Sequence, residues 1–163
     1  MPIVLDGTVG ITTPTEQAAT TIGVGNATPS TSGAGITFPA TQSASTNANT
    51  LDDYEEGTWT PNQGAGLTVV GAFSSSGTYT KIGNQVTVVF SISGATTIAI
   101  SAAGVISTNL PFTVKAGIDS PGTLYRYGAA GGQCMAGNTA NIIYNGAAIS
   151  AGGGIQGMIT YFV

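Results

Sequence analysis

The chain has 163 residues, of which three are basic and seven are acidic, so only 6% are charged and the net charge is −4. Ordinary globular domains carry roughly 25% charged residues, whereas disordered chains combine low hydrophobicity with high net charge. Three basic residues are too few to form a positively charged surface that could neutralise phosphates, which argues against nucleic-acid binding. We therefore expect a β-rich protein whose surface is largely hidden in an assembly. The alternative is a soluble monomer with an unusually uncharged surface.

Missing residue types exclude several further chemistries. The chain has no histidine and a single cysteine, Cys134, which excludes histidine–cysteine zinc sites and an intrachain disulfide framework. The first residues lack the basic and apolar regions of a signal peptide. No run approaches the ~18 apolar residues of a membrane span. We expect no cofactor and no membrane insertion, and we expect synthesis in a cytoplasm.

The first segment, residues 1–49, is polar and contains no lysine or arginine. Its glycine, threonine and proline residues leave no helical apolar stripe, and short strand-favouring pieces occur at 2–5, 9–12 and 35–38. The pattern at 10–14 returns at 35–39, either by chance or as two contacts laid on a neighbouring subunit by strand addition. A segment this polar cannot bury enough apolar surface to fold by itself. We therefore predict an extended attachment arm, ending in a polar linker at 40–49.

Residues 50–61 contain four of the seven acids and the only tryptophan. We expect the acids Asp52, Asp53, Glu55 and Glu56 to lie on the surface. The apolar side of the stretch would be formed by Leu51, Tyr54 and Trp59. The stretch has three interpretations: a paired-carboxylate enzyme site, a divalent-cation site, or a solvated acidic turn beside a tryptophan anchor. We favour the last and predict a clasp between the arm and a distal domain at 62–163.

Strand signals dominate from Trp59 onward. Residues 78–82 and 85–92 alternate with period two around Gly83-Asn84, a two-residue turn whose members tolerate positive φ. This pattern predicts a β-hairpin. A strand at 67–73 and a turn at 74–77 would precede it. Further strands are predicted at 96–101, 105–107, 112–115, 123–127, 132–135, 141–144, 147–150 and 155–163.

The spacing of these strands, about 8–12 residues with turn residues between them, is typical of an antiparallel sandwich or barrel. The distal domain is therefore predicted to be all-β, an antiparallel β-sandwich of jelly-roll-like form. Residues 157–163 are too apolar for a loose tail. We predict that they form an inner strand or lie in a subunit interface.

Residues 51–61, LDDYEEGTWTP, resemble a motif that recurs in tail fibres and related host-contact or capsid-fibre proteins of tailed bacteriophages. The continuation at 77–88, the segment Asn109-Leu110-Pro111-Phe112 and the start at 1–12 are also similar. The resemblance spans roughly residues 1–12, 50–92 and 109–112 and fades beyond residue 113. It implies a homotrimeric virion fibre, in which the arm binds another virion protein of the baseplate, tail or capsid. The distal domain would then contact a host surface glycan or protein.

Six residues in the divergent part are the candidates for receptor contact: Asp119, Tyr125, Arg126, Tyr127, Asn141 and Tyr144. Aromatic faces, amides and carboxylates suit sugar binding, although tyrosines that alternate along Tyr125-Arg126-Tyr127 are also ordinary strand residues. The alternative with the same fold is a capsid decoration or head-fibre protein. A third alternative is a depolymerase tailspike. Asp119 is the only acid after Glu56, which excludes a carboxylate pair within the distal domain. We therefore expect no enzyme activity and no catalytic or metal-binding residues.

Overall fold

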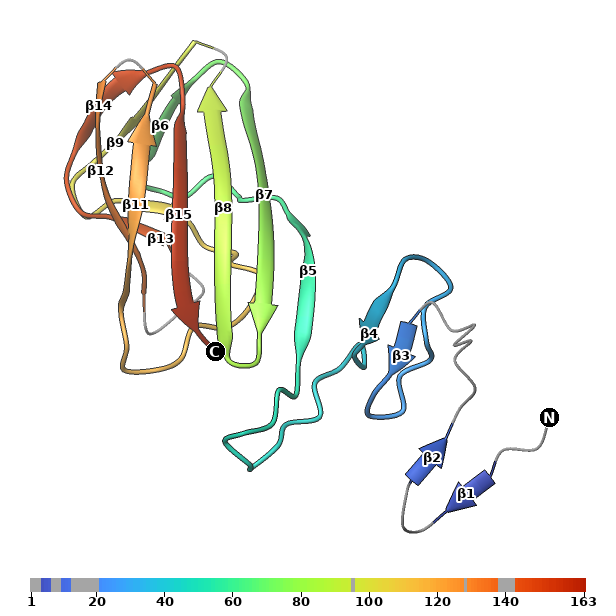
Figure 1. Cartoon of the computed structure of the whole chain (residues 1–163). Coiled ribbons are helices and arrows are strands. Elements are labelled where there is room, and N and C mark those ends of the chain that lie inside the picture. The colour runs from blue at the N-terminus through green and yellow to red at the C-terminus, as the bar shows by residue number, and fades with distance from the viewer. Residues whose placement is uncertain (1–3, 7–9, 13–20, 95, 128, 138–142) are drawn as a thin grey trace. The chain divides into compact units, whose positions relative to one another are not determined.

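The computed structural model describes residues 4–6, 10–12, 21–94, 96–127, 129–137 and 143–163. Its regular structure is all β-strand, which confirms the all-β prediction (Figure 1). The described residues contain no helix that is long and apolar enough to cross a membrane. The chain divides into two compact units, residues 1–53 and 54–163, which are described separately below.

The first unit contains two small sheets. Strands β1 (Val4–Asp6) and β2 (Gly10–Thr12) are antiparallel, whereas β3 (Thr21–Gly23) and β4 (Gly35–Thr37) are parallel. The Thr21 hydroxyl accepts a hydrogen bond from the Thr37 hydroxyl (3.0 Å) and donates one to the Ser30 carbonyl (2.9 Å). The repeated pattern thus does form strands in both places. Each of these strands pairs within its own chain, so the unit is not a wholly extended arm.

The linker at 40–49 contains no strand, in agreement with its polar composition. The Asp52 carboxylate accepts hydrogen bonds from the Gln42 side-chain amide (3.2 Å) and from the Ser45 backbone N–H (2.7 Å). Asp53 is only 4% exposed. The expectation that all four acids of the 50–61 stretch lie on the surface was therefore wrong for Asp53.

The second unit has two antiparallel sheets that contribute to one core. The larger sheet has the order β10-β13-β12-β11-β15-β8-β7-β5, and the smaller sheet has the order β14-β9-β6. The strands of the larger sheet are β5 (Tyr54–Trp59), β7 (Phe73–Ile82), β8 (Gln85–Gly94), β10 (Val105–Ser107), β11 (Ser120–Arg126), β12 (Ala129–Ala136), β13 (Ile143–Asn145) and β15 (Ile155–Phe162). Those of the smaller sheet are β6 (Leu67–Val70), β9 (Thr97–Ile100) and β14 (Ile149–Gly152).

The core side of the larger sheet follows the period-two pattern of β8. Val86, Val88, Phe90 and Ile92 are all buried, and β15 contributes Ile155, Ile159 and Tyr161 in the same way. The smaller sheet covers them with Leu67, Ile98, Ile100 and Ile149. The inner strand predicted at the C-terminal end is therefore confirmed: β15 lies between β8 and β11.

The predicted hairpin is confirmed and is longer than expected. Gly83 adopts a φ of 55° in the turn, and the two strands pair from Ile82–Gln85 back to Phe73–Gly94. The turn predicted at 74–77 was wrong, because these residues belong to β7 and pair with residues 90–93. The chain instead turns at Gly71, whose φ is 86°. Serine and glycine are weak strand formers, and here their partners on β8 override that preference.

Two further predictions were wrong. Residues 112–115 form no strand, although the Lys115 N–H donates to the Phe162 carbonyl (2.7 Å). The acidic stretch is not a turn, since Tyr54–Trp59 forms the edge strand β5. A strand accommodates the neighbouring acids Glu55 and Glu56 because successive side chains point to opposite faces.

Aromatic rings lie over glycines across four strands. Trp59, Gly77, Phe90 and Gly157 are direct neighbours in the ladder, and the Trp59 and Phe90 rings meet edge to face with centroids 6.4 Å apart. A Cβ atom at Gly77 would collide with the Trp59 indole, and one at Gly157 with the Phe90 ring. Glycine is therefore required at both positions by the close approach of a ring.

Candidate functional site

The register defines two ends of the larger sheet. The row Tyr54, Ile82, Gln85 and Phe162 marks the entry end, where the chain enters this unit. The row Ser75, Ile92, Ile155 and Arg126 marks the far end. Seven residues along β8 separate the two rows, which corresponds to roughly 24 Å of extended strand.

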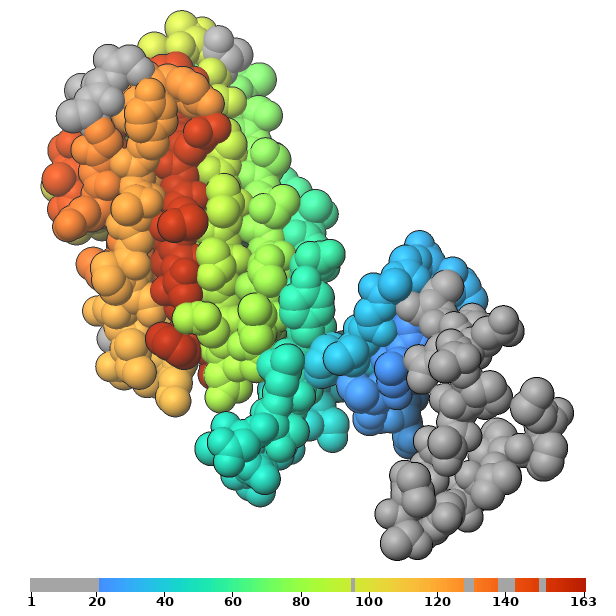
Figure 2. Space-filling view, viewed as in Figure 1, coloured from blue at the N-terminus to red at the C-terminus, as the bar shows by residue number. Residues whose placement is uncertain are grey.

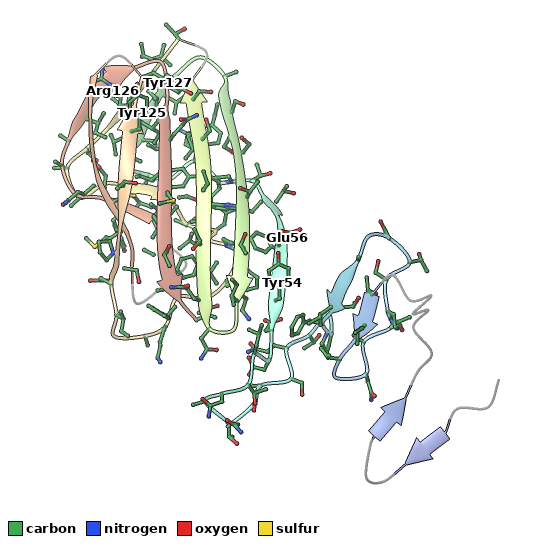
Figure 3. All side chains as sticks on the ribbon, in the orientation of Figure 1. Tyr54, Glu56, Tyr125, Arg126 and Tyr127 are labelled. Atoms are coloured by element: carbon green, nitrogen blue, oxygen red, sulfur yellow. The ribbon has the colours of Figure 1, made fainter. Side chains whose placement is uncertain are left out.

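Tyr125 and Tyr127 lie at the far end (Figure 3). Their side chains are both exposed, Tyr125 by 55%, and their rings meet edge to face with centroids 5.7 Å apart. Arg126 is half-buried, alternates to the opposite face of the strand, and packs its guanidinium against Gly152. The exposed cluster at this end therefore consists of two aromatic rings and no cation.

Two other receptor candidates, Asp119 and Tyr144, lie away from this cluster. Asp119 is exposed but precedes β11 at its start, toward the entry end. Tyr144 is half-buried on β13, where it pairs with Met135 and its ring lies beside Gly137. Asn141 lies outside the described residues. Of the candidates that the structure describes, only Tyr125 and Tyr127 are neighbours on one exposed surface.

The three predicted clasp residues do not share one apolar side. Tyr54 is exposed on the outer face of β5, where its hydroxyl donates to the Glu56 carboxylate (3.0 Å), an interaction that raises the Tyr54 pKa. Trp59 points to the opposite face and packs against the core. Leu51 belongs to the first unit and is exposed. Of the three, Trp59 alone anchors the motif in the core of the second unit.

Glu55 links the motif to the hairpin. The Tyr79 hydroxyl donates a 2.5 Å hydrogen bond to the Glu55 carboxylate, and the Tyr79 ring meets the Phe112 ring edge to face at 5.2 Å. The hydrogen bond to Glu55, with burial and the negative charge of Glu55 as smaller causes, raises the Tyr79 pKa to about 12. One motif acid thus has a structural role.

Two asparagines join the end of the motif to the segment at 109–112. The Asn62 side-chain carbonyl accepts hydrogen bonds from the Ser107 hydroxyl (2.9 Å) and the Thr108 N–H (2.7 Å). The Asn109 side chain accepts from the Asn62 N–H (2.8 Å) and donates to the Thr60 carbonyl (2.9 Å). The sequence suggested both segments through their resemblance to fibre proteins, but it gave no signal of this contact.

Replacing Tyr79 by phenylalanine is expected to destabilise the protein by about 1–2 kcal/mol near neutral pH, since one charge-assisted hydrogen bond is lost. The folded-state pKa of Tyr79 is raised, so its contribution is fully present below the ordinary tyrosine pKa of 10.0 and is lost as pH rises through about 12. The difference in unfolding free energy between wild type and Tyr79→Phe should therefore shrink across that interval. Urea unfolding of both proteins at a series of pH values measures it. A difference that stays constant to the upper limit would contradict the role given to Glu55.

The titratable groups offer little reactive chemistry. Among the described residues, no three His, Cys, Asp or Glu side chains are grouped so that they could hold a metal ion. Cys134 is buried, and burial raises its pKa to about 12, so the nucleophilic thiolate is disfavoured at neutral pH.

The second unit has a further exposed surface that no sequence pattern indicated, which we call the outer face. It is the side of β5, β7, β8, β15 and β11 that points away from the core, and Figure 2 shows these strands side by side. Its exposed large apolar side chains are Tyr54, Ile82, Val89, Tyr125, Met158 and Phe162. The period-two pattern of β8 placed Val89 opposite the core, but a single outward valine carries no signal until its neighbours on other strands are known.

Two shallow hollows cross the middle of the outer face. One, of about 460 Å³, is lined by hydroxyl side chains of β5, β7 and β8, by the Trp59–Gly77–Phe90 row, and by Val89 and Gln156. The other, of about 260 Å³, includes Val89, Gln156, Met158 and Tyr125. The two share Val89 and Gln156, so together they form one uneven band across the strands.

No protein-family model matches the chain, and a search of curated proteins finds no significant relative.

Proposed function

We propose that this chain is a structural subunit of a tailed-bacteriophage virion, a short tail fibre that contacts the host surface. In this proposal residues 1–49 attach the subunit to another virion protein, and the second unit is the distal domain. Its two sheets would form a jelly-roll-like sandwich, and three copies would form the fibre. The resemblance of residues 51–61 to the fibre motif supports the assignment, and so do the all-β fold and the scarcity of charge.

The observation that carries the proposal is that the chain enters the second unit at one end of the larger sheet and the exposed tyrosines lie at the other end. The chain enters at the row of Tyr54, and the exposed pair Tyr125 and Tyr127 lies at the far end of the same sheet. A fibre needs this separation, because its attachment and its receptor contact must lie at different ends. Two exposed rings at an angle suit stacking on a sugar or packing against an apolar protein loop. Arg126 is left out of the proposed contact, because it packs on the opposite side.

Alanine replacement of both Tyr125 and Tyr127 tests the receptor contact. The purified protein should compete with virions for adsorption to host cells, and the double variant should need roughly tenfold more protein or higher, the factor for losing an aromatic anchor. Ile118→Ala is the matched control, because Ile118 is exposed and apolar but lies in the loop before β11. Unchanged competition by a folded double variant would remove the two tyrosines from the contact.

The virion location separates the tail-fibre proposal from the head-fibre alternative. Electron microscopy of particles labelled at this protein should place the label at the tail. Label on the capsid shell would contradict the tail location and favour the alternative.

A further inference from the structure

The centre of the outer face exposes two neighbouring apolar side chains. Val89 and Met158 are direct neighbours at its centre and are 48% and 50% exposed. Ile82 and Phe162 add a second exposed apolar group at the entry end. The row of Thr80, Thr87 and Thr160 separates this group from Val89 and Met158. Scattered apolar residues are normal on a protein surface, so the adjacent exposed pair Val89 and Met158 is the feature that suits a protein contact.

The charges of the second unit avoid this face. Among its described residues, Glu56 on the edge strand β5 is the only charged side chain that points outward from the larger sheet. Glu55 and Arg126 point to the opposite face and Lys81 is buried, whereas Lys115 and Asp119 lie outside the strands. A strongly charged partner would find nothing complementary here. A second copy of this chain would bring no like charge against the centre of the face.

The size of the face fits a subunit interface. Five neighbouring strands at ~4.8 Å spacing and roughly 24 Å of paired length give a surface on the order of 500 Å² before side-chain relief is counted. A standard interface buries about 800 Å² per partner. The face alone therefore provides roughly 60% of the area that a standard interface buries on each partner, and other parts of the chain would add the rest.

The surface shape of the outer face also suits contact with the same face of a second copy, because it has both a projecting side chain and hollows. Met158 is a long, flexible side chain that projects beside the two hollows, and the hollows share Val89 and Gln156. Thr58, Thr78 and Thr123 lie in the same ladder row as Val89 and Met158. An apolar centre bordered by hydroxyls matches the usual apolar core and polar rim of a protein interface.

We propose that copies of this chain associate through the outer face, with Val89 and Met158 at the centre of the contact. Met158 of one copy fills the hollow beside Val89 of the next. Tyr125 and Tyr127 lie at the margin of the contact, at the far end. The inference rests on the self-assembly included in the proposed function, and it assigns that assembly to a surface.

Val89→Lys tests the interface, with Val70→Lys as the matched control. Val70 is 49% exposed, almost equal to Val89, but lies on β6 of the smaller sheet. Light scattering on the full chain should give an oligomer for wild type and Val70→Lys. For Val89→Lys the dissociation constant should rise at least about 30-fold, as expected for a central interface residue. Far-UV circular dichroism checks that each variant is folded, and Met158→Glu replaces Val89→Lys if the latter does not fold.

Two results would overturn the proposal: a monomeric wild type at micromolar concentration, or folded Val89→Lys and Met158→Glu variants that keep the wild-type mass. The adsorption assay separates this outcome from failure of the fibre function. A monomeric wild type that still competes for host cells would defeat only the interface. An oligomer that depends on Val89 but does not compete would defeat only the host contact.

Discussion

Deletion of residues 159–163 is expected to abolish folding of the second unit. Residues 159–162 form the second half of β15, which lies between β8 and β11 in the larger sheet. The deletion removes Ile159 and Tyr161, whose side chains are fully buried, and leaves the adjacent parts of β8 and β11 without their common neighbour. Loss of two large core side chains alone costs about 5–9 kcal/mol, comparable with the whole stability of a typical domain.

Soluble yield and far-UV circular dichroism measure this effect. Deletion of Val163 alone is the control, because that residue lies beyond β15 and its N–H makes one backbone hydrogen bond to Asn84 (3.0 Å). The shorter deletion should leave the fold intact with only a small loss of stability. A soluble, normally folded protein that lacks all of residues 159–163 would show that β15 is dispensable.

Phe90→Ala is expected to lower the free energy of unfolding by about 3–5 kcal/mol, as for other buried aromatic residues. The Phe90 ring is 2% exposed, covers the backbone of Gly157 and meets the Trp59 ring edge to face. Its removal leaves a cavity that the glycine beside it cannot fill. The same change therefore loosens the packing of Trp59, which ties the edge strand β5 to the core.

Urea denaturation monitored by the fluorescence of Trp59, the only tryptophan, reports both effects. Val70→Ala serves as the control, since this exposed side chain should cost less than about 0.5–1 kcal/mol. An equal loss for both variants would contradict the central position of Phe90. A Phe90→Ala variant with unchanged fluorescence would contradict its contact with Trp59.

The sequence predicted the strands whose own hydrophobic pattern shows which of their residues are buried. The strands on either side of Gly83-Asn84 alternate strictly, so their inner residues could be assigned before any partner was known. The strand at residues 157–163 was predicted in a different way, because an apolar segment of that length is rarely left in solvent. In both cases the residues of the segment are enough to predict that it is buried, without knowledge of its partner strands.

Elements that depend on a distant partner were not predictable. Residues 74–77 read as a turn, and only their pairing with β8 makes them a strand. The acidic stretch read as a turn because nothing in it indicated that Tyr79 would hold Glu55. For the candidate site, the sequence identified Tyr125 and Tyr127 but could not show which face of their strand is exposed. The outer face went unnoticed because its members come from five strands.

The central position of β15 has a consequence for biosynthesis. Strands β8 and β11 are made well before it, and neither has its neighbour on that side until residues 155–162 leave the ribosome. Until then both strands present unpaired backbone groups and apolar side chains, the features that promote wrong pairing between nascent chains. Completion of the sheet is therefore a late event after a long loop has closed, which slows folding. Neighbouring ribosomes on one message would hold several such unfinished chains close together.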